Sequence, residues 1–203
     1  MSPAAASPLL EEVTVPPRAV AFRLASAGFA FPDDGWRPRL EAYLESARRS
    51  RAVAAAGLAR LEKALGEIGI EELAAAHCRL FGSAPACPLE LAFHSSREPF
   101  AQARKIADLS GFYKAFGVEP EGRADSLPTV LEFLAYLEIK RVHAEKKGWT
   151  GRVEIARDAS FRLRSDLGLK AVGVFARRLS TAGAPDLYRQ LAALCRTLMG
   201  GAP

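Results

Sequence analysis

Residues 107–137 read ADLSGFYKAFGVEPEGRADSLPTVLEFLAYL, a stretch in which two helical patterns flank a short acidic loop. In the first pattern Leu109, Tyr113 and Phe116 recur at helical spacing and share one face. Gly117 follows directly, and glycine is the residue most often found just beyond a helix C-terminus. The stretch therefore predicts a helix that ends at a glycine and leads into a loop.

The second pattern begins near Ser126, which can cap a helix N-terminus, and Pro128, which fits a first turn. It continues to about Lys147, where Gly148 can end it. One apolar face of this helix is predicted to reach a core through Val130, Phe133, Leu134 and Leu137. Because two packed helices hold the loop between them, we interpret the loop as the candidate functional surface.

Carboxylates are concentrated on this loop and on the helix that follows it. Glu119, Glu121 and Asp125 lie on the loop, and Glu132 lies near the start of the helix. A rim of negative charge suits a cationic peptide. The plain alternative for Asp125 is a helix cap or its neighbour, and the alternative for Glu132 is a solvated carboxylate.

The rest of the chain repeats the helical period and not the alternation of strands. We predict an all-α fold, a single-domain bundle of about eight or nine helices over residues 16–199. Residues 1–15, rich in Ala, Pro and Ser, are predicted to form a flexible N-terminal arm. Residues 82–96 are predicted to form an irregular loop, after which Ser95 and Glu98 match a capping box for the next helix.

Length and composition describe one ordinary globular domain. The chain has 203 residues, of which 49% are hydrophobic and 25% charged, which is typical of a soluble protein and argues against global disorder. It contains no apolar run of roughly eighteen residues and begins with no secretory signal pattern. Its three cysteines form no CxxC pair, which favours reduced thiols. We therefore predict a cytoplasmic protein.

The sequence contains no pattern typical of a catalytic site. It lacks a Gly-rich phosphate loop, HExxH and GxSxG, and it has only three histidines. His77, Cys78, Cys87 and His94 are near one another in the chain, but their spacing matches no standard zinc pattern. We predict structural histidines and buried thiols, with no metal, no cofactor and no enzyme activity. Arg79 is predicted to tie down a helix end by hydrogen bonds.

Four segments of the sequence resemble one family. They are HCRLF at 77–81, PLE at 88–90, GFYKAFG at 111–117 and LEFLAYL at 131–137. Together they resemble the TorD/DmsD/NarJ group of redox-enzyme maturation chaperones, whose length and rhythm of helices the chain also fits. Two pairs depart from that pattern: members often have Asp-His where this chain has Asp125-Ser126, and a similar pair where it has Ser165-Asp166.

The resemblance implies a chaperone without enzyme activity. Its client would be the catalytic subunit of a molybdopterin-dependent oxidoreductase, which it would hold while the cofactor is inserted. Many such clients carry a leader of two arginines followed by an apolar run, and a helical groove with an acidic rim suits that chemistry. The resemblance and the acidic loop together indicate seven client-binding residues: Glu90, Tyr113, Glu119, Glu121, Asp125, Ser126 and Glu132.

A second hypothesis rests on the distribution of charge. The formal net charge is +5, but residues 140–178 contain 11 Lys and Arg against 4 Asp and Glu, a local net charge of +7. This basic third is consistent with a helical regulator that binds nucleic acid. No helix-turn-helix signature accompanies it, and scattered Lys and Arg on amphipathic helices commonly serve solubility. Retention on heparin or DNA at moderate salt separates the two hypotheses.

Overall fold

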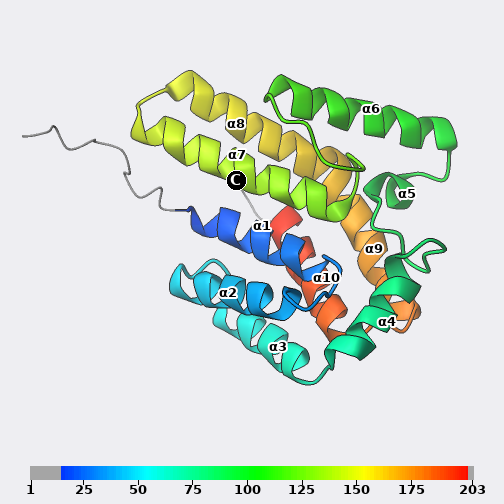
Figure 1. Ribbon diagram of the computed structural model, residues 1–203. Helices are drawn as coiled ribbons and strands as arrows, with labels where there is room; N and C mark the ends of the chain where they lie inside the picture. The colour runs from blue at the N-terminus through cyan, green and yellow to red at the C-terminus, as the bar shows by residue number, and fades with distance from the viewer. Residues whose placement is uncertain (1–14, 201–203) are drawn as a thin grey trace, which may run out of the picture.

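Ten α-helices make up the computed structural model, which describes residues 15–200 (Figure 1). These residues contain no strand, so the predicted all-α class is confirmed. None of their helices is long and apolar enough to cross a membrane. The predicted N-terminal arm lies, except for its last residue, outside the described residues. The helices are α1 (Pro17–Gly28), α2 (Trp36–Arg49), α3 (Ala55–Gly66), α4 (Ile70–Phe81), α5 (Leu91–Ser95), α6 (Pro99–Ala115), α7 (Leu127–Lys146), α8 (Thr150–Arg162), α9 (Leu169–Thr181) and α10 (Asp186–Gly200), and the π-helical segment η1 (Leu163–Gly168) joins α8 to α9.

The predicted irregular loop over residues 82–96 contains a short helix, α5, which raises the number of helices from nine to ten. Leu91 and Ala92 of α5 are buried, and its last residue is Ser95. The predicted capping box is therefore wrong. The Ser95 hydroxyl donates to the Ala92 carbonyl (2.8 Å), and α6 begins separately at Pro99. A five-residue helix is too short for its period to be recognised in a sequence.

Helix α7 is at the centre of the fold. It lies between α1 and α8 and packs against both (Figure 1). The predicted core face of α7 is confirmed, because all four of its residues are buried: Val130, Phe133, Leu134 and Leu137. The C-terminal helix α10 packs on α1, α3 and α9 and so closes the other side of α1.

An aromatic cluster ties the first helices to the last. The ring of Phe29, just after α1, stacks on Tyr188 of α10 with centroids 5.9 Å apart, and it meets Phe175 of α9 edge-on at 5.6 Å. Phe81, at the end of α4, meets Tyr188 edge-on at 5.1 Å. Edge-on and offset aromatic pairs stabilise a core beyond the area that they bury. The cluster therefore fixes helices that are remote in the sequence.

The predicted C-terminal ends of α6 and α7 and the predicted start of α7 are confirmed. Gly117 follows α6 with a φ of 67°, and Gly148 follows α7 with a φ of 69°. This left-handed backbone is one that glycine adopts without steric cost. Ser126 is the N-cap residue of α7 and Pro128 lies in its first turn, although the Ser126 side chain makes no capping hydrogen bond.

Candidate functional site

The segment between α6 and α7, residues 116–126, begins with a defined turn. The amide of Gly117 donates to the Lys114 carbonyl (3.0 Å), and the amide of Val118 donates to the Tyr113 carbonyl (2.9 Å). These bonds satisfy carbonyls at the C-terminus of α6 that have no partner within the helix. We call residues 116–126 the α6–α7 loop.

A short antiparallel bridge joins this loop to the Pro-Leu-Glu segment that precedes α5. Glu90 pairs with Ser126 across the bridge. On either side, backbone amides donate to carbonyls, from Leu91 to Asp125 at 2.8 Å and from Leu127 to Leu89 at 2.9 Å. The Pro-Leu-Glu segment at 88–90, which contributes to the family resemblance, therefore meets the Asp125-Ser126 pair at the N-terminus of α7.

Asp125 is completely buried beneath this bridge. Arg123 donates to both of its carboxylate oxygens, through Nε to Oδ1 (3.1 Å) and through Nη2 to Oδ2 (3.3 Å). The amide of Ala92, in the first turn of α5, donates to Oδ2 (3.4 Å). Arg123 also lies 3.7 Å from Oε1 of Glu90. The predicted place of Asp125 on an exposed acidic rim is therefore wrong, and its carboxylate fastens the α6–α7 loop to α5.

Tyr113 of α6 holds the α6–α7 loop through a hydrogen bond. It is buried, and its hydroxyl donates to the carbonyl of Ala124 (2.8 Å). Its ring meets Phe133 of α7 edge-on, with centroids 4.6 Å apart. Burial raises the pKa of the Tyr113 hydroxyl above its ordinary value, and the nearby Asp125 carboxylate adds to the rise. The tyrosine therefore stays neutral and acts as a hydrogen-bond donor within the protein.

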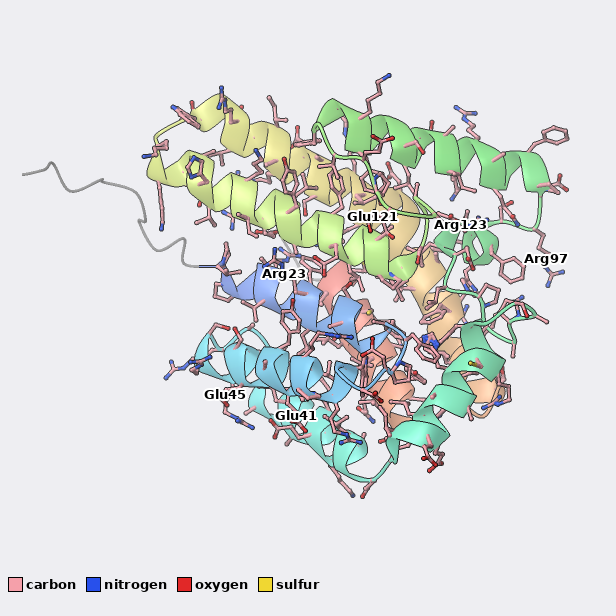
Figure 2. All side chains as sticks on the ribbon, in the orientation of Figure 1. Arg23, Glu41, Glu45, Arg97, Glu121 and Arg123 are labelled. Carbon is pink, nitrogen blue, oxygen red and sulfur yellow. The ribbon has the colours of Figure 1, made fainter. Side chains whose placement is uncertain are left out.

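Glu119 and Glu121 are exposed on the loop, and neither forms an ion pair with the residues that the structure describes. Figure 2 shows Glu121 and Arg123 on the loop that joins α6 to α7. Between α6 and the loop lies a cavity of about 740 Å³, which we call the loop cavity; its lining includes Lys114, Glu119, Arg123 and Asp125. The border of this cavity is mixed in charge, not uniformly acidic.

Glu132 does not belong to this group. It lies on α7 and pairs with Arg23 of α1, with Nε and Oε2 3.8 Å apart and both side chains partly exposed. Figure 2 shows Arg23 on α1, on the other side of α7 from the loop. Of the seven predicted site residues, the structure thus interlocks four (Glu90, Tyr113, Asp125 and Ser126), leaves two exposed on the loop (Glu119 and Glu121) and places Glu132 against α1.

A second cavity, of about 580 Å³, lies on the other side of α6, against the end of α8 and η1. We call it the α6–α8 groove. Its lining is mainly apolar, with four charged residues among its members: Lys105, Ala107, Asp108, Leu109, Gly111, Phe112, Ala115, Phe116, Arg162, Leu163 and Asp166. Of the seventeen residues of α6 only Leu109 and Tyr113 are buried, so this helix offers most of its surface to the two cavities and to solvent.

Two contributors to these surfaces were not predicted from the sequence. Arg123 is the main partner of Asp125. The only sequence feature that indicates this pair is the spacing of two residues within a turn, which lets the arginine side chain reach back to the carboxylate. Asp166 borders the α6–α8 groove and accepts a hydrogen bond from the Ser165 hydroxyl (3.0 Å). The Ser165-Asp166 pair is one of the two departures from the family pattern, so both departures lie beside the candidate surfaces.

The histidines and cysteines do not gather around a metal position. In the described part of the chain no group of three or more His, Cys, Asp or Glu residues could hold an ion. Nε2 of His94 donates to the Pro88 carbonyl (2.7 Å), and His77 lies 3.3 Å from the Phe29 carbonyl. Burial lowers the pKa of both histidines and raises the pKa of the Cys87 thiol to about 12. These features are those of structural residues, but Cys78 is exposed, so the predicted burial of its thiol is wrong.

Several arginines of the basic third make contacts within the protein. Arg141 pairs with Glu138 (3.0 Å) and Glu145 (2.5 Å), and Arg164 is buried. The guanidinium of Arg152 lies over the Trp149 ring, 4.3 Å from its centroid. Part of the local +7 charge is thus held in pairs and stacks, and the geometry gives no specific support to a nucleic-acid-binding face.

One comparison with known proteins identifies the chain. The family model described as nitrate reductase delta subunit matches residues 48–165, which is more than half of the chain. The matched segment contains α6, the α6–α7 loop, α7 and α8, and so it includes the bridge and most of the groove. No curated protein matches the chain.

Proposed function

This chain belongs to the nitrate reductase delta subunit family, and from that membership we propose that it is a dedicated chaperone for the catalytic subunit of a molybdopterin-dependent oxidoreductase. Family members are non-catalytic assembly proteins of redox enzymes, so we expect no reaction from this chain itself. In this proposal the protein acts in the cytoplasm, holds its client while the cofactor is inserted and then releases it.

The observation that carries the finer proposal, binding of a client leader, is the mainly apolar α6–α8 groove together with two exposed carboxylates on the loop that follows α6. The groove presents Phe112 and Phe116 along one side of α6. Glu119 and Glu121 follow at the end of the same helix, without ion pairs to described residues. A leader of two arginines followed by an apolar run has the complementary chemistry, because guanidinium groups pair with carboxylates and an apolar segment fills a groove.

The interlocked residues have a different role in this proposal. Glu90, Tyr113, Asp125 and Ser126 hold the α6–α7 loop in place, so that Glu119 and Glu121 stand at a fixed position relative to the groove. We expect apolar burial to supply most of the binding free energy. Exposed ion pairs contribute only about 0–1 kcal/mol each, so the carboxylates mainly set the register of the leader.

A synthetic leader peptide tests this proposal by titration against three variants. Phe112→Ser removes an apolar wall of the groove and should weaken binding roughly 10-fold or more. Glu119→Lys with Glu121→Lys replaces attraction by repulsion and should weaken it roughly 3- to 30-fold. Glu154→Lys, an exposed charge reversal on α8, is the matched control and should bind as the unmodified protein does. Unchanged affinity in both test variants, with circular dichroism showing intact folding, would refute leader binding at this surface.

The class of client is tested separately, by capture of partners from the native cytoplasm and their identification by mass. Recovery of a large molybdoenzyme subunit supports the chaperone role whether or not the leader binds in the groove. Recovery of that subunit by the Phe112→Ser variant as well would place the main contact elsewhere on the protein. Failure to recover any redox-enzyme subunit would contradict the proposed role.

A further inference from the structure

A cavity of a different kind lies between α1, α7, α8 and η1. It measures about 420 Å³ and is lined by Arg18, Glu138, Arg141, Arg157, Ser160 and Arg164, so four of its six residues are arginines. We call it the arginine cavity. It shares no lining residue with the loop cavity or the α6–α8 groove. It therefore needs an explanation apart from the proposed function.

Two residues of the arginine cavity are almost fully buried and polar. Arg164 is 4% exposed, and its Nε donates to the carbonyl of Ser160 (3.3 Å). Ser160 is 5% exposed, and its hydroxyl has no hydrogen-bond partner among the described residues. A serine within a helix commonly donates to the carbonyl four residues earlier, and a buried hydroxyl without any partner costs folding free energy. The Ser160 hydroxyl is thus an unused hydrogen-bonding group in the wall of the cavity.

The single carboxylate of the cavity is shared among its arginines. Glu138 lies 3.0 Å from Arg141 and 3.7 Å from Arg18, and Arg141 is also paired with Glu145 outside the cavity. Arg157 forms no ion pair with the described residues. Burial lowers the pKa of Arg164, and repulsion from Arg18 lowers it further, while attraction to Glu138 opposes both effects. The lining thus contains four arginines and one carboxylate, and an anion in the cavity would add attraction to its guanidinium groups.

We propose that the arginine cavity binds a small phosphorylated molecule, whose phosphoryl oxygens accept hydrogen bonds from the guanidinium groups and from the Ser160 hydroxyl. Guanidinium groups match phosphate geometry and retain their charge when partly buried. The donors come from four different elements and surround a confined volume, which favours a compact ligand over an extended nucleic-acid backbone. This site also accounts for part of the local +7 charge, because Arg141, Arg157 and Arg164 come from the basic third.

Pyrophosphate and inorganic phosphate are suitable probes, titrated at constant ionic strength and followed by calorimetry and thermal unfolding. We expect pyrophosphate to bind more tightly than phosphate and to raise the melting temperature. Arg157→Gln should weaken pyrophosphate roughly 10-fold, because an exposed arginine is removed without disturbing the core. Ser160→Ala should weaken it several-fold while leaving the stability of the unliganded protein equal or higher. Arg177→Gln, an exposed arginine of α9, is the matched control and should change nothing.

Four results would overturn the inference. One is the absence of pyrophosphate binding by the folded, unmodified protein. A second is binding that Arg157→Gln, Ser160→Ala and Arg177→Gln affect equally, because that indicates only general attraction to a basic surface. The third is a short DNA duplex that binds more tightly than pyrophosphate and loses affinity in Arg157→Gln and Ser160→Ala. Vesicles with phosphorylated lipid headgroups form a separate arm, and preference for them over free pyrophosphate would contradict a soluble ligand.

Discussion

Removal of the Asp125 carboxylate tests whether the α6–α7 loop is held by the contacts that the structure shows. Asp125→Ala deletes two hydrogen bonds from Arg123 and one from the amide of Ala92. Breaking a buried ion pair costs about 3–5 kcal/mol. The Asp125 side chain is 0% exposed but that of Arg123 is 57% exposed, so water solvates the arginine that remains. We therefore expect a smaller loss, about 2–3 kcal/mol in the free energy of unfolding.

Asp125→Asn separates charge from shape. The amide oxygen still accepts from Ala92, so we expect a loss of about 1–2 kcal/mol. Glu119→Gln, an exposed change on the same loop, is the control and should stay within about 0.5 kcal/mol of the unmodified protein. A double-mutant cycle with Arg123→Ala should give a coupling of about 1–2 kcal/mol.

Urea unfolding followed by far-ultraviolet circular dichroism measures these differences. For a domain of this size each kcal/mol shifts the melting temperature by about 2–4 °C, so Asp125→Ala should lower it by roughly 4–12 °C. The reasoning fails if Asp125→Ala is as stable as Glu119→Gln, or if the cycle shows no coupling between Arg123 and Asp125.

Three further predictions concern single side chains. Burial lowers the pKa of His94 in the folded state. The neutral imidazole therefore contributes its full stability above the ordinary pKa of about 6.5, and this contribution is lost as the pH falls through the lowered pKa. His94→Gln should therefore make the free energy of unfolding depend less on pH in this acid range. The buried hydroxyl of Tyr188 has no hydrogen-bond partner in the part of the chain that the structure describes, so Tyr188→Phe should leave stability equal or raise it by up to about 1 kcal/mol in urea unfolding, and a clear loss would contradict this. Ser126→His should change stability by less than about 0.5 kcal/mol, because the Ser126 side chain makes no capping bond; a loss above about 1 kcal/mol would show that the serine itself is required.

The features that the sequence predicted correctly depend on local spacing and stereochemistry. The helical period of residues 130–137 identified a core face, and Gly117 and Gly148 marked helix ends because their backbone is left-handed. Arg79 was assigned to the support of a helix end, and it does donate to the carbonyls of Ala182 (2.8 Å) and Gly183 (3.2 Å). Its partners were not predictable, since they lie in the turn after α9 and no local pattern connects the two segments.

The candidate site was harder to predict because its contacts are long-range. Two carboxylates that are close in sequence make contacts with different parts of the fold. Asp125 is buried and accepts hydrogen bonds from Arg123 and from α5, whereas Glu132 pairs with Arg23 of α1. Their hydrophilic character alone predicted exposure for both. Only the fold shows which acid has a cation within reach, and a buried carboxylate is stable only where one is present together with hydrogen-bond donors.

The geometry gives a physical reason for the departure from the family pattern at Ser126. This residue takes part in the bridge to Glu90 through its backbone, and its carbonyl accepts from the amide of Val130 (2.9 Å) in the first turn of α7. Both contacts are independent of the side chain, so a histidine and a serine are equally compatible with the bridge. Asp125, in contrast, acts through its carboxylate. The aspartate of the pair thus maintains the loop, whereas the bridge does not depend on the side chain of the position that follows it.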